Sequence, residues 1–146
     1  MATIQRQVLD AVVARLRASP AIIARPSDRI RIAHRTQVTR EESPAIHVRP
    51  QTDTPTIGKD CVERRLAFDV VVFGRDDGGV ESIDALLVDV MARLKPGRGD
   101  AIPYPDGVRL APGAISFTEE DADEDVAFAS LAFVATYSTA AWSLEA

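Results

Sequence analysis

The sequence predicts an α+β fold: a mostly antiparallel sheet with two amphipathic helices on one face, in a single domain of residues 1–146. The composition is that of an ordinary globular domain, with 46% hydrophobic and 27% charged residues. Two segments show the apolar spacing of helices, and several others show strand patterns. Strands that follow one another without an intervening helix form antiparallel hairpins, which excludes an alternating, all-parallel architecture.

The first helix is expected at Thr3–Ala18. Its apolar positions repeat every four residues and form one stripe: Ile4, Val8, Val12 and Leu16. The hydroxyl of Thr3 is suited to cap the start of this helix, and Ser19 followed by Pro20 is expected to end it.

Three strands and one polar connection are expected next. Isoleucine and arginine alternate in Arg29–Arg35, which is typical of a half-buried strand with a basic outer face. Ala45–Arg49 predicts a second, short strand. The polar stretch Gln51–Lys59, which holds proline and glycine, predicts an exposed loop or the tip of an extended hairpin. Cys61–Phe73 predicts a strand with apolar residues on both faces, as in the middle of a sheet.

The second helix is expected at Val80–Lys95, after a glycine- and aspartate-rich turn at residues 74–79. Its apolar residues recur at steps of three and four, and Pro96 ends it. Glu81 and Asp84 lie near its start, where negative charge complements the helix dipole.

Three strands are expected after this helix: Val108–Leu110, Ala114–Thr118 and Val126–Thr139. Pro112 and Gly113 are expected to separate the first two. Glu119–Asp125 contains six acids in seven residues and predicts a solvated hairpin connection. The last strand alternates imperfectly, which indicates either a long central strand or a bulge.

The charges of the two parts of the chain differ in sign. Residues 1–50 hold nine arginines and four acids, whereas residues 51–146 hold eight basic and eighteen acidic residues. Such a chain offers complementary basic and acidic faces for contacts between copies. The net charge of −5 also disfavours nonspecific binding to a nucleic-acid backbone.

The residues of a catalytic, metal or cofactor site are not expected in this chain. His34 and His47 lie on separate predicted strands without ligand spacing. Cys61 is the single cysteine and is expected to be a buried small residue at the start of a strand. The acidic run resembles the start of a calcium loop, but Val126 and Ala132 replace its glycine and closing glutamate. These observations predict a protein that is not an enzyme and needs no cofactor.

No apolar run is long enough to cross a bilayer, and the first residues lack the layout of a signal peptide. A single cysteine also excludes an intrachain disulfide framework. A chain made in a reducing cytoplasm is therefore expected, without contact to a membrane.

Five stretches together resemble a known family. They are the helix Thr3–Ala18, the start of a strand at Ser43–Val48, the strand Glu63–Arg75, the helix Ile83–Leu94 and the final strand Asp125–Thr139. In their order and pattern they resemble the tail terminator proteins, also called tail completion or minor tail proteins, of long-tailed bacteriophages. The resemblance covers nearly the whole chain and rests on the pattern of elements.

The resemblance implies a structural protein of the virion. Copies of the chain would form a ring, expected to be hexameric, that caps the tail tube, ends its polymerisation and joins the tail to the head-side connector. The implied partners are further copies of the chain, the tail tube protein and the connector or neck protein. The implied location is the head-proximal end of the tail after assembly in the host cytoplasm, with DNA passing through the ring without sequence-specific binding.

Two sets of residues are candidates for these contacts. Basic residues are expected to pair with acids of a neighbouring copy: Arg29, Arg31, Arg35 and Arg40 with Asp76, Asp77, Glu119, Glu120, Asp121, Asp123 and Asp125. Alternatively, the acids are expected to face the lumen of the ring, where their negative charge would repel the DNA that passes through. A loop is expected to face the tube or the connector: Gln51, Thr52, Asp53, Thr54, Thr56 and Lys59.

Three alternatives remain open at this point. Another head–tail joining or neck protein would share the pattern of elements. A small cytosolic enzyme or ligand-binding domain would have a deep pocket with converging polar groups. A nucleic-acid-binding regulator would have a continuous basic surface and salt-dependent binding.

Overall fold

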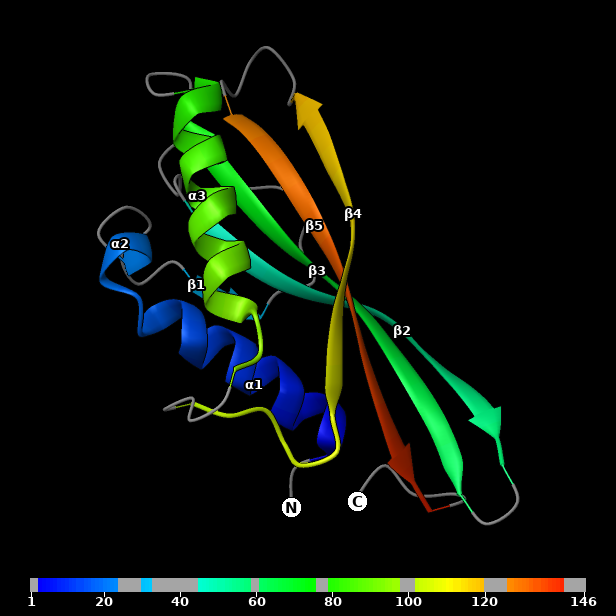
Figure 1. Ribbon diagram of the computed structural model, residues 1–146. Helices are drawn as coiled ribbons and strands as arrows, with labels where there is room; N and C mark the ends of the chain where they lie inside the picture. Colours follow the sequence, from blue (N-terminus) through cyan, green and yellow to red (C-terminus); the bar gives the residue numbers. More distant parts are fainter. Residues whose placement is uncertain are drawn as a thin grey trace.

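The computed structural model describes residues 3–23, 30–32, 45–58, 61–75, 79–97, 102–119 and 126–140. These residues form three helices and a twisted, five-stranded sheet (Figure 1). The elements in chain order are α1 (Ile4–Arg17), α2 (Pro20–Ile23), β1 (Ile30–Ile32), β2 (Ala45–Ile57), β3 (Val62–Arg75), α3 (Gly79–Leu94), β4 (Arg109–Glu119) and β5 (Val126–Thr139). The α+β class predicted from the sequence is confirmed.

The strand order in the sheet is β1-β2-β3-β5-β4, so β1 and β4 are the edge strands. Strand β1 runs parallel to β2, and the pairs β2–β3, β3–β5 and β4–β5 are antiparallel. Strands β3 and β5 pair along their full length, from Val62 opposite Thr139 to Arg75 opposite Val126. The long central strand expected at Val126–Thr139 is confirmed, because β5 lies between β3 and β4 without a shift in its register with β3.

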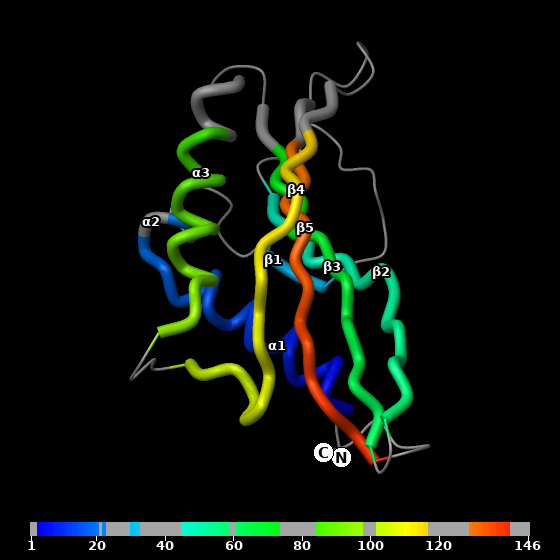
Figure 2. The backbone as a smooth tube through the Cα atoms, turned by 45° about the vertical axis from the view of Figure 1, so that its right-hand side comes forward, coloured from blue at the N-terminus to red at the C-terminus, as the bar shows by residue number. Residues whose placement is uncertain are grey.

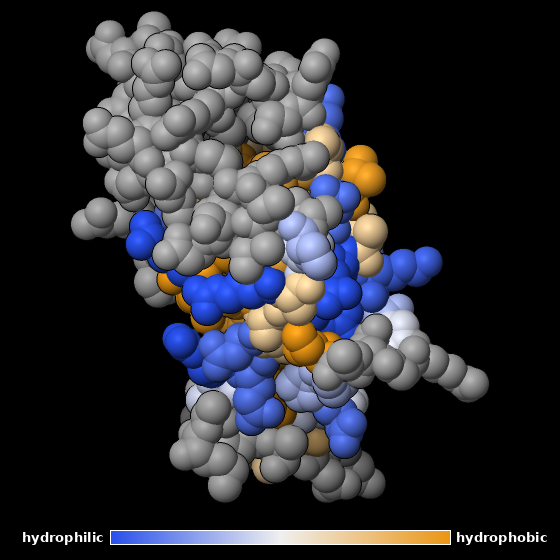
Figure 3. Space-filling view, turned by 90° about the vertical axis from the view of Figure 1, so that its left-hand side faces the viewer, coloured by the Kyte–Doolittle hydropathy of each residue, from blue (hydrophilic) through white to orange (hydrophobic). Residues whose placement is uncertain are grey.

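The core lies between the sheet and the two long helices, which cover the same face (Figures 1 and 2). Residues of the predicted apolar stripes of α1 and α3 are buried, as with Val8, Leu16 and Leu94. Leu9 and Leu86, outside the predicted stripes, are buried beside them. On the sheet, Phe68 and Phe133 stack with their ring centres 5.6 Å apart. Where described residues are visible on this side of the molecule, Figure 3 shows hydrophilic side chains with apolar patches between them.

The start of α1 confirms the predicted cap. The hydroxyl of Thr3 accepts a hydrogen bond from the backbone N–H of Arg6 at 3.2 Å. The predicted stop at Ser19 and Pro20 is also confirmed, since α1 ends at Arg17. Pro20 then begins the four-residue helix α2, which the sequence analysis did not predict. Proline is well suited to a first helical position, because its missing N–H has no partner there in any case.

One strand replaces the two that were predicted around Pro112 and Gly113. Strand β4 runs from Arg109 to Glu119 through both residues, with a shift in its register to β5 between Pro112 and Ile115. A side chain at position 113 would lie 3.3 Å from the Cβ and the carbonyl oxygen of Ala132, so glycine permits the close approach of the two backbones. The two breaker residues therefore form a bulge in an edge strand.

A buried arginine joins the two long helices. The guanidinium of Arg15 donates hydrogen bonds to the carbonyl oxygens of Ile102 at 2.8 Å and Lys95 at 3.3 Å. It also lies 4.0 Å from the ring centre of Tyr104. Arg93 in turn donates to the carbonyl oxygen of Arg15 at 2.8 Å. These contacts satisfy carbonyl groups at and beyond the end of α3, and they hold that helix against α1.

Candidate functional site

The predicted charged interface lies partly within the described residues. Arg31 is an exposed residue of β1, and its Nε lies 3.4 Å from Nε2 of the buried His47. Glu119 is the last residue of β4. The other members of the predicted pairs lie outside the described residues: Arg29, Arg35, Arg40, Asp76, Asp77, Glu120, Asp121, Asp123 and Asp125.

The structure places Arg31 and Glu119 at opposite edges of the sheet. Three strands separate β1 from β4, so the two edges lie roughly 19 Å apart at the usual strand spacing. At this separation the two residues do not pair within one chain, so the predicted pairing requires two copies. The pairing itself stays a prediction.

The stretch predicted to be a loop facing the tube or connector is one arm of a hairpin. Residues Gln51–Ile57 belong to β2, and Thr52–Ile57 pair with the first part of β3 after a shift in register between Pro50 and Thr52. This arm extends beyond the helices at the lower right of Figure 1. The exposed loop was therefore the wrong alternative for these residues, and the extended hairpin was the right one. Lys59 lies outside the described residues. The predicted residues Gln51, Thr52, Thr54 and Thr56 are exposed.

Asp53 differs from its neighbours because its side chain is largely buried at the base of the arm. It accepts hydrogen bonds from the hydroxyl of Tyr137 and the amide of Gln5, and from Nη1 of Arg64 at 3.3 Å. The side chains of Asp53 and Arg64 are only 10% and 19% exposed. Burial raises the pKa of the Tyr137 hydroxyl, and the hydrogen bond to Asp53 raises it further. Asp53 therefore holds the arm to α1 and β5 and is not free to contact a partner.

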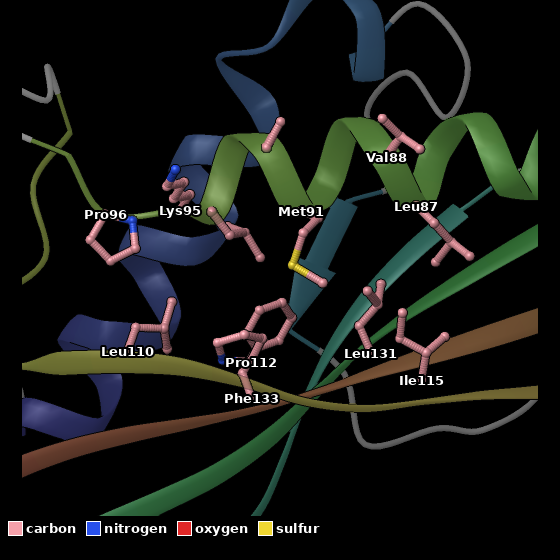
Figure 4. A pocket seen from close by; sticks show the side chains of 12 residues that line it. Leu87, Val88, Met91, Lys95, Pro96, Leu110, Pro112, Ile115, Leu131 and Phe133 are labelled. Atoms are coloured by element: carbon pink, nitrogen blue, oxygen red, sulfur yellow. The ribbon is translucent and has the colours of Figure 1, made fainter.

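An apolar groove of about 700 Å³ lies between α3 and the edge of the sheet (Figure 4). Its lining residues come from α3, the segment after it, β4 and β5: Leu87, Val88, Met91, Ala92, Leu94, Lys95, Pro96, Leu110, Pro112, Ile115, Leu131 and Phe133. Lys95 is the one charged residue among them, at the end of the groove near Leu110 and Pro112 (Figure 4). No local pattern in the sequence predicts this groove, because each of its walls has the pattern of an ordinary helix or strand.

Three large apolar side chains are exposed among the described residues. Ile57 at the tip of the arm is 84% exposed, and Val88 and Ile115 in the groove are 69% and 45% exposed. Single exposed apolar residues are common on protein surfaces, but two in one apolar groove mark a surface suited to binding.

Of the residues considered for chemistry, His47 and Cys61 take ordinary positions in the fold, and His34 lies outside the described residues. His47 is buried, with its ring against Phe73 at 5.1 Å between centres. Cys61 is exposed, so the expectation of a buried cysteine was wrong. It lies in the turn of the hairpin, just before β3 begins at Val62.

Within the part of the chain that the structure describes, no group of three or more His, Cys, Asp and Glu is placed to hold a metal ion. None of the helices in that part has the length and hydropathy needed to span a bilayer.

Comparison with known proteins finds a similar fold but no similar sequence. No family model and no curated protein matches the sequence. The fold is similar to that of a chain in the solved structure of the virion of a native gene transfer agent particle, with a TM-score of 0.57 and 17% sequence identity. The match covers 94% of this chain and 96% of that chain. The two chains share a fold. At this identity the likeness shows the architecture alone, and it extends over nearly the full length of both chains.

Proposed function

We propose that this chain is a structural protein of a phage-like particle, acting as one domain over residues 1–146. The observation that carries the proposal is the similarity of fold to a virion chain, which spans 94% of this chain and leaves little of it for another domain. We further propose the specific role of a tail terminator. In this role a hexameric ring of copies caps the tail tube, ends its polymerisation and joins the tail to the connector.

The arrangement of the sheet supports assembly into a ring. A ring of identical copies needs two different surfaces on each copy, which meet head to tail. The edge strands β1 and β4 supply such surfaces, with Arg31 on one edge and Glu119 at the end of the other. Exposed ion pairs stabilise by only about 0.2–1 kcal/mol each, so several such pairs would have to act together across this contact.

The same proposal gives the partners and the location. One face of the ring would contact the last ring of the tail tube protein, and the other would contact the connector or neck protein. DNA would pass through the centre without sequence-specific contacts. The chain would then reside at the head-proximal end of the tail.

The mass of the protein in solution tests the ring. Light scattering across a concentration series, followed by negative-stain imaging of the largest species, is expected to show closed rings of about six copies. The same preparation, mixed with purified tail tubes, is expected to decorate one end of each tube. A protein that stays monomeric at every concentration and does not bind tube ends would overturn the role of tail terminator.

A ligand-binding domain is the second candidate, and the apolar groove favours it. A groove of about 700 Å³ is within the range of sites for small molecules. In that case a monomer would bind an apolar fluorescent probe with a defined stoichiometry, and the substitution Ile115→Asp would abolish binding. Binding that disappears as the protein assembles would instead assign the groove to contacts between copies.

A further inference from the structure

The exposed apolar side chains of the described residues lie at two separate places in the fold. Ile57 projects from the tip of the hairpin arm, whereas Val88 and Ile115 lie in the groove between α3 and β4. Ile57 also faces the side of the sheet that the helices cover. Ile57 pairs with Val62 of β3. Alternate residues of a strand share a face, so Val62 lies on the same face as Leu66 and Phe68, which belong to the core between the sheet and the helices. Tip and groove are therefore both open on the same side of the sheet.

One chain cannot bring these two places together. The tip belongs to β2 and the groove is bounded by β4, and β3 and β5 lie between them in one hydrogen-bonded sheet. Two such surfaces can meet only between copies, and repetition of a contact of this kind gives a ring or a filament.

The register of the sheet gives the displacement between copies that each pair of surfaces would need. Ile57 lies in the same row as Thr139, and Leu110, at the Lys95 end of the groove, lies opposite Ala135, four residues away along β5. The row of Arg31 runs through His47 and Val71 to Ser130. Glu119 lies opposite Ala127, three residues from Ser130 and in the same direction.

A neighbour shifted by four residues, about 13 Å, would therefore place Leu110 of its groove in the row of Ile57 and on the same face of the sheet. The same shift would place its Glu119 in the row of Ile32, one residue from Arg31. The apolar surfaces therefore set the offset between copies, and the charged edges come near one another at that offset.

We propose that the tip of the hairpin arm of one copy inserts into the α3–β4 groove of the next copy, with Ile57 against Leu110 and Pro112. This inference rests on the proposed function, because it assumes that copies associate head to tail. It assigns the groove to a second copy of this chain rather than to a small molecule.

The charges of the two surfaces permit this contact. Residues 54–58 of the tip, Thr-Pro-Thr-Ile-Gly, carry no charged side chain, so no charge loses its hydration on entering the groove. Lys95 lies at the end of the groove and is exposed, so its long side chain is able to keep the ammonium group in water. Pro55 and Pro112 remove N–H groups from the two strands, which disfavours a continuous sheet and favours contact through side chains.

The size of the groove indicates an anchor within a larger contact. Twelve residues line it, whereas one side of a stable interface contributes about 20–30 residues. The arm and groove would therefore supply the apolar centre, and the charged edges of the sheet would supply the rim.

The native cysteine provides a direct test. Cys61 is the single cysteine of the chain and is exposed beside the tip. The variant Lys95→Cys adds a second exposed thiol at the groove, and Ala18→Cys adds one at the far end of α1 as a matched control. With a short bis-maleimide, Lys95→Cys is expected to form covalent multimers at least tenfold faster than Ala18→Cys, and Cys61→Ser in the same chain is expected to abolish them.

Two outcomes of the cross-linking would overturn the inference. The first is equal rates for Lys95→Cys and Ala18→Cys. The second is cross-linking of Lys95→Cys that persists after Cys61→Ser, because that product joins two grooves rather than a tip and a groove.

A pair of neighbouring substitutions provides a second test without cross-linking. Ile57→Asp is expected to raise the concentration needed for assembly at least tenfold. Thr56→Asp adds the same charge to the opposite face of the strand and is expected to change it less than twofold. Equal effects of the two substitutions would contradict the inference.

The two proposals fail in different ways. If closed rings form but Cys61 and the new thiol of Lys95→Cys do not cross-link, the ring is supported and its interface is not the arm and the groove. If the two thiols cross-link specifically in open chains that do not bind tube ends, the docking of the arm is supported and the role of tail terminator is overturned.

Discussion

The base and the tip of the hairpin arm differ in how their side chains are used. At the base, the largely buried carboxylate of Asp53 is bonded to α1, β3 and β5 through Gln5, Arg64 and Tyr137. At the tip, four positions further along β2, Ile57 is 84% exposed. Polar contacts at the base therefore fix the direction of the arm, while its apolar tip stays exposed. Such an arrangement is expected of a preformed binding element, which loses little conformational entropy on docking.

Removal of the carboxylate at the base is expected to have the largest effect on stability. Asp53→Ala leaves the guanidinium of Arg64 and the hydroxyl of Tyr137 without their shared partner in a largely buried place, which is expected to cost about 3 kcal/mol. Urea unfolding followed by circular dichroism measures the change. Thr54→Ala, at the next and exposed position, is the control and is expected to change stability by less than about 0.5 kcal/mol. Similar losses for both variants would show that the base is not the anchor of the arm.

Removal of the tyrosine hydroxyl is expected to have a smaller effect. In Tyr137→Phe the carboxylate of Asp53 keeps its bonds to Gln5 and Arg64, so the loss is expected to be about 1–2 kcal/mol. The same unfolding experiment measures it. A double variant, Asp53→Ala with Tyr137→Phe, is expected to lose less than the sum of the single changes, because the two groups act on one another. Strict additivity would contradict a direct coupling.

The pH dependence of the unfolding free energy is expected to report on the hydrogen bond between Tyr137 and Asp53 at the base of the hairpin arm. The pKa of Tyr137 in the folded protein lies above its ordinary value of about 10. The contribution of the protonated Tyr137 hydroxyl to the stability of the fold is therefore fully present below pH 10. It is lost as the pH rises from 10 toward the pKa of Tyr137 in the folded protein. Unfolding free energies across this range are expected to fall less steeply in Tyr137→Phe than in the unchanged protein. Equal slopes would show that the hydroxyl titrates as in the unfolded chain.

A polar substitution at the tip is expected to have the smallest effect on the stability of the monomer. Ile57→Ser changes a side chain that is already exposed to water, so the unfolding free energy is expected to change by less than about 0.5 kcal/mol. Assembly of copies, measured by light scattering on the same samples, is expected to weaken. A large loss of monomer stability would show that Ile57 is part of the fold and would remove the contrast between base and tip.

Local patterns predicted the elements whose partners are nearby in sequence. The cap at Thr3 depends on an N–H three residues away, and the apolar stripe of α1 repeats within one helix. Strand β5 was predicted with the same bounds that the structure shows, because this stretch contains no proline, glycine or charged residue that would interrupt a strand. Interactions of this kind are set by spacing along the chain.

Elements that depend on distant residues were missed or predicted wrongly. Pro112 and Gly113 appear as breakers in the sequence, yet β5 holds them in one strand because Gly113 fits against Ala132. Asp53 appears as one polar residue of a loop, and only the packing of α1 and β5 against the arm buries most of its side chain. Cys61 appears as the start of an apolar strand, but the turn of the hairpin leaves it exposed.

The fold class and the two amphipathic helices follow from the amino-acid sequence, because helix and strand periodicities are properties of short segments. The segregation of charge is likewise a property of the sequence. The candidate surfaces depend on the tertiary structure. It placed Arg31 and Glu119 on opposite edges, formed the groove from α3 and β4, and directed the arm away from the helices. These features arise from the order of strands in the sheet and from the register between them, which pair residues that lie far apart in the chain.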